Sequence, residues 1–136
     1  MSINDQIKLF PSEVFGTVKV PPSKSLSHRA LICASLAKGK SIIKNVLLSE
    51  DITATMNALK HLGAKFEVNG DEITVHGVRR LRYDNEDIYC NESGSTMRFL
   101  IPIFSLTKKE ITFTGKKSLI SRPQNIYKEI FEEDGN

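Results

Sequence analysis

A basic and hydroxyl-bearing cluster lies near the N-terminus, where a helix is predicted to begin. Lys24 and Ser25 occupy the start of this helix, and Arg29 follows Ser25 by four residues, so Ser25 and Arg29 share one helix face. Free N–H groups and the dipole at a helix N-terminus favour an anion. Lysine adds a point charge, serine a short donor, and arginine a fork that grips phosphate or carboxylate. The cluster is therefore a candidate anion site, although a capped helix with exposed basic side chains has the same pattern.

Two later clusters have a similar composition. Residues 91–98 form a turn around Gly94 that leads into a predicted helix, with hydroxyl side chains and Arg98 close behind. Backbone can approach a ligand closely at a glycine. In the third cluster Arg122 precedes Pro123, a residue suited to the first position of a helix, so Arg122 should lie near a positive helix end. Each cluster alone also fits an ordinary helix start.

The order of the three clusters resembles the N-terminal motifs of the 5-enolpyruvylshikimate-3-phosphate synthase family, over residues 16–130. The matching segments are Pro22-Ser23-Lys24-Ser25 with Arg29, Ser93-Gly94-Ser95-Thr96-Met97-Arg98, and Arg122-Pro123. The resemblance implies an enzyme that transfers the enolpyruvyl group of phosphoenolpyruvate to the 5-hydroxyl of shikimate 3-phosphate and releases phosphate, in the shikimate pathway. It implies no cofactor and no metal.

The resemblance also implies roles for individual residues. By motif position, Lys24 would contact both substrates and take part in catalysis. Ser25 and Arg29 would hold shikimate 3-phosphate, and Gly94 and Arg122 would line the phosphoenolpyruvate site.

One departure from the family pattern concerns the turn before Gly94. Glu92 stands where many members have a neutral asparagine, which changes how this turn would meet an anion. We expect Arg98 to be a structural partner of a carboxylate such as Glu92. Arg29→Ala should then weaken shikimate 3-phosphate binding more than Arg98→Ala.

Acid–base groups for the reaction are not evident in this sequence. The available carboxylates are assigned to charged turns and helix caps: Glu50, Asp51, Glu86 and Asp87. In the family these groups belong largely to the other domain. We therefore expect that the C-terminal domain is needed for a complete site and that this chain alone is inactive.

The elements that must position the clusters follow from apolar periodicity, caps and turns. They are a strand at 16–20, a helix at 25–37, a strand at 41–46, a helix at 49–62, a hairpin of strands 65–68 and 72–76, a helix at 95–106 kinked or delayed by Pro102, a strand at 110–114 and a helix from Pro123. Residues 78–89 are polar and unassigned.

The element order predicts an α+β fold built from repeated units. After an N-terminal segment, 1–15, residues 16–80 would form one unit and 86–136 an incomplete second unit of a partial N-terminal domain. The resemblance implies βαβαββ units, three to each domain of the complete enzyme. The sequence therefore suggests a chain that is cut short.

Composition limits the other functions. The net charge of +3, without a clustered basic stripe, argues against a nucleic-acid partner. No apolar stretch is long enough to span a membrane, and the N-terminus does not resemble a signal peptide, so a cytoplasmic location is expected. Cys33 is predicted to be a small core residue, and His28 to face solvent.

Two alternatives stay open from the sequence. One is a fragment of the related UDP-N-acetylglucosamine enolpyruvyl transferase, which usually has Lys-Asn where this chain has Lys24-Ser25. The other is a non-catalytic truncation that folds and binds ligand without turnover.

Overall fold

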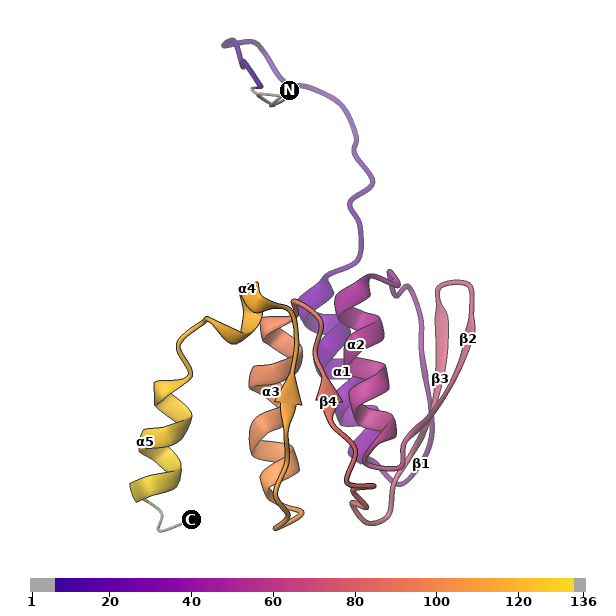
Figure 1. Ribbon diagram of the computed structural model, residues 1–136. Helices are drawn as coiled ribbons and strands as arrows, with labels where there is room; N and C mark the ends of the chain where they lie inside the picture. Colours follow the sequence, from indigo (N-terminus) through magenta and orange to yellow (C-terminus); the bar gives the residue numbers. More distant parts are fainter. Residues whose placement is uncertain (1–6, 134–136) are drawn as a thin grey trace.

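Three helices form the centre of the computed structural model, which describes residues 7–133 (Figure 1). They are α1 (Lys24–Leu36), α2 (Glu50–Lys60) and α3 (Gly94–Ser105). A serine precedes each helix, and its side chain accepts a backbone N–H in the first turn, which satisfies a donor that the helix itself cannot pair. Serine caps and apolar stripes therefore explain why the helices begin where they do.

A three-stranded antiparallel sheet covers one side of α1 and α2. Its strands are β1 (Gly39–Ile43), β2 (Lys65–Asn69) and β3 (Glu72–Gly77), in the order β1-β3-β2. The hairpin between β2 and β3 turns at Gly70, whose φ of 62° suits glycine. A Cβ at Gly77 would collide with the carbonyl oxygen of Ala37, so glycine lets the end of β3 pass close to the end of α1.

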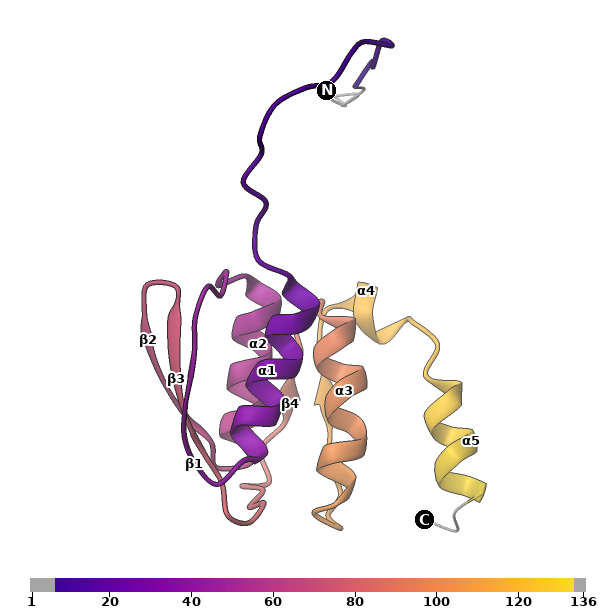
Figure 2. The same ribbon diagram turned by 180° about the vertical axis from the view of Figure 1, so that it is seen from behind.

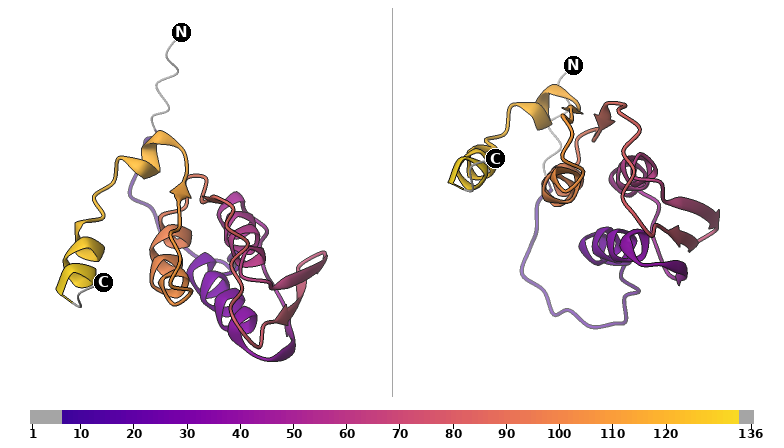
Figure 3. Two further views of the ribbon diagram at one scale, coloured as in Figure 1. Left: turned by 60° about the horizontal axis from the view of Figure 1, so that its bottom comes forward. Right: turned by 90° about the horizontal axis from the view of Figure 1, so that it is seen from below.

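A shorter parallel pair lies beside α2 and α3, on a different side of the helices from the three-stranded sheet, as the end-on view shows (Figure 3). It consists of β4 (Ile88–Tyr89) and β5 (Phe113–Thr114), which flank α3 in the sequence. The short helix α4 (Lys117–Ile120) follows β5. The strand expected at 110–114 is thus shorter than predicted, and β4 and α4 were not predicted.

The core lies where the helices meet each other and the two sheets. Its largest fully buried apolar side chains come from all three helices, from β3 and β4 and from neighbouring segments: Phe104, Leu31, Ile52, Leu59, Leu62, Ile73, Ile88, Leu100 and Leu119. Phe104 packs edge-on against Tyr83 and Phe113, with ring centroids 5.6 Å away in each case. One continuous core therefore joins the segments before and after α3.

The strand predicted at 16–20 is wrong. Residues 16–20 form no strand, and the side chains of Val18 and Val20 are 83% and 75% exposed. A strand needs a partner for its backbone groups, and within residues 7–133 this segment has none. The helix predicted at 95–106 is found as α3, and of the two effects expected of Pro102 the later start is excluded, because α3 begins at Gly94 and continues through the proline.

The buried face of α1 also differs from the prediction. Cys33 is exposed, whereas the ring of His28 is fully buried. His28, Leu31 and Ser35 follow one another at helical spacing and face α2 and the sheet, which turns Cys33 to solvent. Because α1 has apolar residues on most of its faces, the sequence pattern did not determine which face is buried.

The last helix, α5 (Asn125–Glu133), stands apart from the body (Figures 1 and 2). It was predicted from its apolar stripe, yet it has no buried residue, and Ile126 is 57% exposed. The Tyr127 hydroxyl donates to the backbone oxygen of Arg98 at 2.7 Å and ties α5 to α3. Among residues 7–133, no helix has the length and apolar character needed to cross a membrane.

Candidate functional site

The N-termini of α1, α2 and α3 lie at the same end of the molecule, the upper end in Figures 1 and 2. The three helices are in contact with one another. Their positive dipole ends and unpaired N–H groups are therefore concentrated in one region, which favours bound anions.

A hollow of about 500 Å³ opens at this end. Its lining residues come from the three helices and from the turns beside them: Lys24, Asp51, Glu92, Gly94, Ser95, Arg98, Phe99 and Arg122. Three of the residues singled out in the sequence, Lys24, Gly94 and Arg122, are thus brought together from separate clusters. Three cationic and two acidic side chains line the hollow, so it carries a net positive formal charge.

Lys24 forms an ion pair across the hollow. Its Nζ lies 2.6 Å from Oδ2 of Asp51, in the first turn of α2. Both side chains are partly exposed, so the pair adds little to stability. The contact matters more for where it places the lysine, because it holds the ammonium at the wall of the hollow, beside the start of α2.

Arg122 reaches the start of α3 from the segment after α4. Its Nε donates to the backbone oxygen of Ser118 at 3.1 Å, which orients the guanidinium. A Cβ at Gly94 would lie 2.9 Å from Nη1 of Arg122. The absence of a side chain at Gly94 therefore gives the guanidinium room beside the helix N-terminus.

Glu92 connects the turn before α3 to the segment around α4. Its carboxylate accepts a hydrogen bond from Ser118 Oγ at 2.9 Å and lies 3.5 Å from Lys116 Nζ. The Ser118 hydrogen bond and then the Lys116 charge hold the pKa of Glu92 below its usual value. Glu92 thus fastens the segment around α4 to the turn before Gly94.

Arg98 is not the partner of Glu92 that the sequence suggested. In the described part of the chain, the ion pair of Glu92 is made with Lys116, and Arg98 is exposed along the wall of the hollow. Lys116 lies nearer because the Glu92 turn and the segment before α4 run side by side, as the hydrogen bond from Lys116 N to Asn91 O shows.

Ser25 and Arg29 lie beside the hollow, outside its lining. The Arg29 Nη1 donates to the backbone oxygen of Ser25 at 3.1 Å, so the two residues do share one helix face. The guanidinium lies 4.9 Å from the ring centroid of Phe99, a residue of the lining. Arg29 therefore borders the site through Phe99.

Sequence reasoning missed the part played by the start of α2. Glu50 and Asp51 were assigned to a helix cap, but both make contacts beyond their own helix. Asp51 pairs with Lys24, and Glu50 Oε2 accepts from Asn91 Nδ2 at 2.9 Å. Their partners are distant in the chain, so no local pattern could have indicated these contacts.

Other kinds of site find little support in residues 7–133. Burial raises the pKa of the Cys90 thiol to about 12, so this cysteine is a core residue and a poor nucleophile. No three His, Cys, Asp or Glu side chains of the described residues are grouped as they would be to hold a metal ion.

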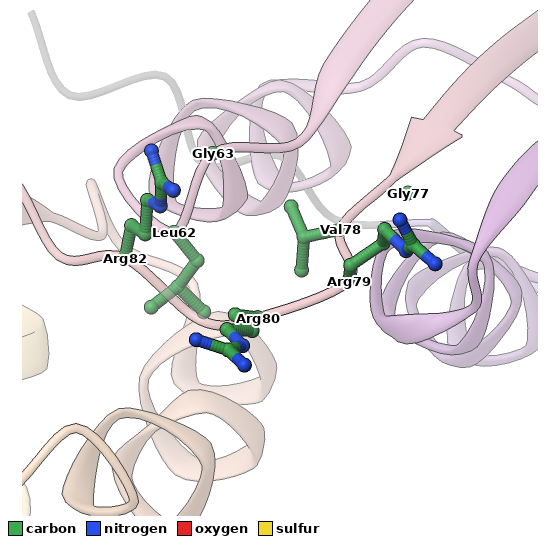
Figure 4. A pocket seen from close by; sticks show the side chains of 7 residues that line it. All are labelled: Leu62, Gly63, Gly77, Val78, Arg79, Arg80 and Arg82. Carbon is green, nitrogen blue, oxygen red and sulfur yellow. The ribbon is translucent and has the colours of Figure 1, made fainter.

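A second hollow, of about 740 Å³, lies near the opposite ends of α1 and α2 and is bordered by Arg79, Arg80 and Arg82. Figure 4 shows that the three guanidinium groups point in different directions. They do not converge on one point, so they do not form a single anion site in this structure.

Comparisons with known proteins show the family of the chain. Residues 10–134 match the family model described as EPSP synthase (3-phosphoshikimate 1-carboxyvinyltransferase). The 3-phosphoshikimate 1-carboxyvinyltransferase of Clostridium perfringens SM101 is 48% identical over 129 residues, which cover 94% of this chain and 30% of that protein. The enzyme of the same name from Clostridium novyi is 47% identical over 140 residues, covering 96% and 32%.

A solved structure gives the same result for the fold. EPSP synthase from Acinetobacter baumannii superposes with a TM-score of 0.80 at 32% identity, covering 88% of this chain and 28% of that one. The chain therefore spans about a third or less of the length of these relatives. Because the family model matches nearly the whole of this chain, the chain belongs to the EPSP synthase family.

Proposed function

We propose that this chain provides part of the substrate site for transfer of the enolpyruvyl group from phosphoenolpyruvate to the 5-hydroxyl of shikimate 3-phosphate, with release of phosphate. The observation that supports this most is the meeting of Lys24, Gly94 and Arg122 at one hollow beside three helix N-termini. Both substrates are phosphorylated, and this hollow has the cationic lining that a phosphate needs.

Each residue of the site would contact a particular substrate. Lys24 lies between the starts of α1 and α2 and would contact both substrates after leaving Asp51. Arg122 and the backbone at Gly94 would hold phosphoenolpyruvate, because the guanidinium lies directly beside the glycine. Ser25 and Arg29 would hold shikimate 3-phosphate at the edge of the hollow.

The same proposal accounts for what this chain would not do alone. General acid and base groups must be held close to the reacting atoms for addition and elimination to proceed. The two carboxylates of the hollow, Asp51 and Glu92, are paired with Lys24 and Lys116. We therefore propose that the C-terminal domain found in complete family members is needed for turnover, and that this chain binds ligand without catalysing transfer.

The direct test is calorimetric titration of the purified chain with shikimate 3-phosphate, with and without phosphoenolpyruvate. We expect shikimate 3-phosphate to bind, and we expect Arg122→Ala to weaken the binding measured with phosphoenolpyruvate present by about tenfold or more, the effect of losing one charge-assisted contact. Arg80→Ala is the matched control, because it removes an arginine from the hollow at the opposite end. Equal losses in both variants, or no binding by the unaltered chain, would contradict the proposal.

The same titration decides between the two arginines near α1 and α3. Arg98 lines the hollow and Arg29 borders it through Phe99. Arg29→Ala should still weaken shikimate 3-phosphate binding more than Arg98→Ala if Arg29 swings from the Ser25 carbonyl to the ligand. The reverse order would assign the ligand to the face of α3.

A further inference from the structure

A chain of four buried polar side chains crosses the molecule beneath the hollow. His28 Nδ1 lies 2.7 Å from Thr55 Oγ1, and Thr55 Oγ1 lies 2.7 Å from Thr96 Oγ1. Thr96 Oγ1 in turn lies 2.7 Å from Oγ of Ser93, the cap of α3. None of the four side chains is more than 1% exposed. Short hydrogen bonds in a dry interior are stronger than those at the surface, so these three hydrogen bonds link α1, α2 and the cap of α3 firmly.

The chain joins the elements that supply the candidate site. His28 belongs to α1, one turn after Lys24, and Thr55 belongs to α2, one turn after Asp51. At its far end, Ser93 immediately precedes Gly94. The hydrogen bonds therefore run directly under three residues that line the hollow.

The directions of the hydrogen bonds can be assigned from the available donors. Ser93 Oγ accepts from Thr96 N at 3.1 Å, and the carbonyl oxygen of Asp51, 3.3 Å from Thr96 Oγ1, can only accept. With the Nδ1–H tautomer, His28 donates to Thr55, and Thr55 donates to Thr96. The Thr96 proton then goes to Ser93 or to the Asp51 carbonyl, so the donors of His28 Nδ1, Thr55 and Thr96 are all used.

The remaining ring nitrogen of His28 shows what would disturb this arrangement. Nε2 is buried and has no hydrogen-bond partner among the described residues. A proton on Nε2 would place a charge and an unpaired N–H in the core, and burial accordingly lowers the pKa of His28. The neutral ring is the form that the chain of hydrogen bonds accommodates.

We infer that His28 and Thr55 are positioning residues, which set the start of α1 against the start of α3 and so fix Lys24 relative to Gly94. The inference rests on the proposed function, because it assigns the two residues to the substrate site described above. Neither residue lines the hollow, and each acts through the residues that do.

Thr55→Val tests the connection with little change in side-chain shape. The substitution removes the hydroxyl between His28 and Thr96, and Thr55→Ser is the conservative control that keeps it. We expect Thr55→Val to shift the Gly94 and Ser95 amide resonances in NMR spectra and to weaken shikimate 3-phosphate binding about tenfold, the effect of one lost buried hydrogen bond. Thr55→Ser should keep both the resonances and the affinity of the unaltered protein.

A purely structural role gives a different result. If Thr55→Val lowers only the melting temperature, with unchanged Gly94 resonances and unchanged affinity in the folded fraction, the inference is wrong. The amide resonances need no ligand. If the unaltered chain binds no shikimate 3-phosphate, the proposed function fails, whereas movement or constancy of Gly94 still decides whether the chain of hydrogen bonds positions it.

A second measurement covers the case in which Thr55→Val does not fold. In the unaltered chain, the Gly94 amide resonance should move with pH over the range in which the His28 ring titrates. The charged groups that face His28 are Asp51 on α2 and Lys24 and Arg29 on α1. A Gly94 resonance that stays constant while the ring signals of His28 titrate would overturn the inference.

Discussion

The starts of α1 and α3 are both capped by a serine side chain, which accepts an otherwise unpaired backbone N–H. They differ in where the cationic side chain beside the helix start comes from. In each, a serine side chain accepts the N–H three residues on, from Leu26 at 3.3 Å in α1 and from Thr96 at 3.1 Å in α3. Ser23 is exposed, whereas Ser93 is buried and also contacts the Thr96 hydroxyl.

The residue after each serine shows the larger contrast. Lys24 follows Ser23 and brings a cation on its own flexible side chain, which crosses to Asp51. Gly94 follows Ser93 and brings no side chain, and the space beside it is taken by Arg122 from a later segment. The cation at the start of α1 therefore belongs to the helix itself, whereas the cation at the start of α3 comes from a segment that only the tertiary structure brings near.

Ser93→Ala should have the largest effect on this comparison. It removes a buried cap, which leaves the N–H of Thr96 without its acceptor and the Thr96 hydroxyl with only the longer contact to the Asp51 carbonyl, at a cost of about 2 kcal/mol in the free energy of unfolding. Ser23→Ala removes an exposed cap, and we expect about 0.5 kcal/mol because water replaces the lost acceptor. Urea unfolding followed by circular dichroism measures both. Equal losses would mean that burial of the α3 cap has no energetic consequence.

The helices and the hairpin could be predicted from the sequence because their signals are local. Serine caps, apolar stripes and the turn at Gly70 all act within a few residues. The strand at 16–20 failed for the opposite reason, since alternation alone does not supply a partner strand. The repeat of two units, with its boundaries, stays a prediction that the structure does not test.

The candidate site could be predicted only where its residues belong to a motif. Lys24, Gly94 and Arg122 were identified in this way, and they meet at the hollow. Asp51 was missed and His28 was placed on the wrong face, because the role of each is set by a residue on another helix. Tertiary contacts of this kind leave no periodic trace in the sequence.

Gly94→Ala should displace the Arg122 guanidinium from the start of α3 without unfolding the protein. The new methyl group would lie 2.9 Å from Nη1 of Arg122, and the end of a flexible side chain can move away. We expect phosphoenolpyruvate binding, with shikimate 3-phosphate present, to weaken about tenfold, or about 1.4 kcal/mol, with little change in melting temperature.

Gly115→Ala is the matched control for this substitution. A Cβ at Gly115 would lie 2.6 Å from the backbone oxygen of Asn91, which cannot move aside cheaply. This variant should lose stability, whereas Gly94→Ala should lose affinity. A Gly94→Ala chain that binds normally would show that Arg122 is not held in place by the open space at the glycine.

The smallest expected effect concerns pH and the connection between the two helix starts. Burial, assisted by Lys24 and Arg29 and opposed by Asp51, lowers the pKa of His28 from its ordinary value of 6.5. Below about pH 6.5 the unfolded chain therefore binds a proton that the folded chain does not. The stability contributed by neutral His28 is complete above this pH and falls as the pH drops toward the folded-state pKa.

The melting temperature of the unaltered chain should therefore fall between pH 7.5 and pH 5.5, and His28→Asn should reduce the fall. Asparagine cannot gain a proton, and its side chain can still donate a hydrogen bond toward Thr55. The comparison at pH 7.5 measures the packing cost of the substitution, and the difference in slope isolates the proton. A slope that is the same in both proteins would mean that His28 is not the group whose protonation weakens the link from α1 to the cap of α3.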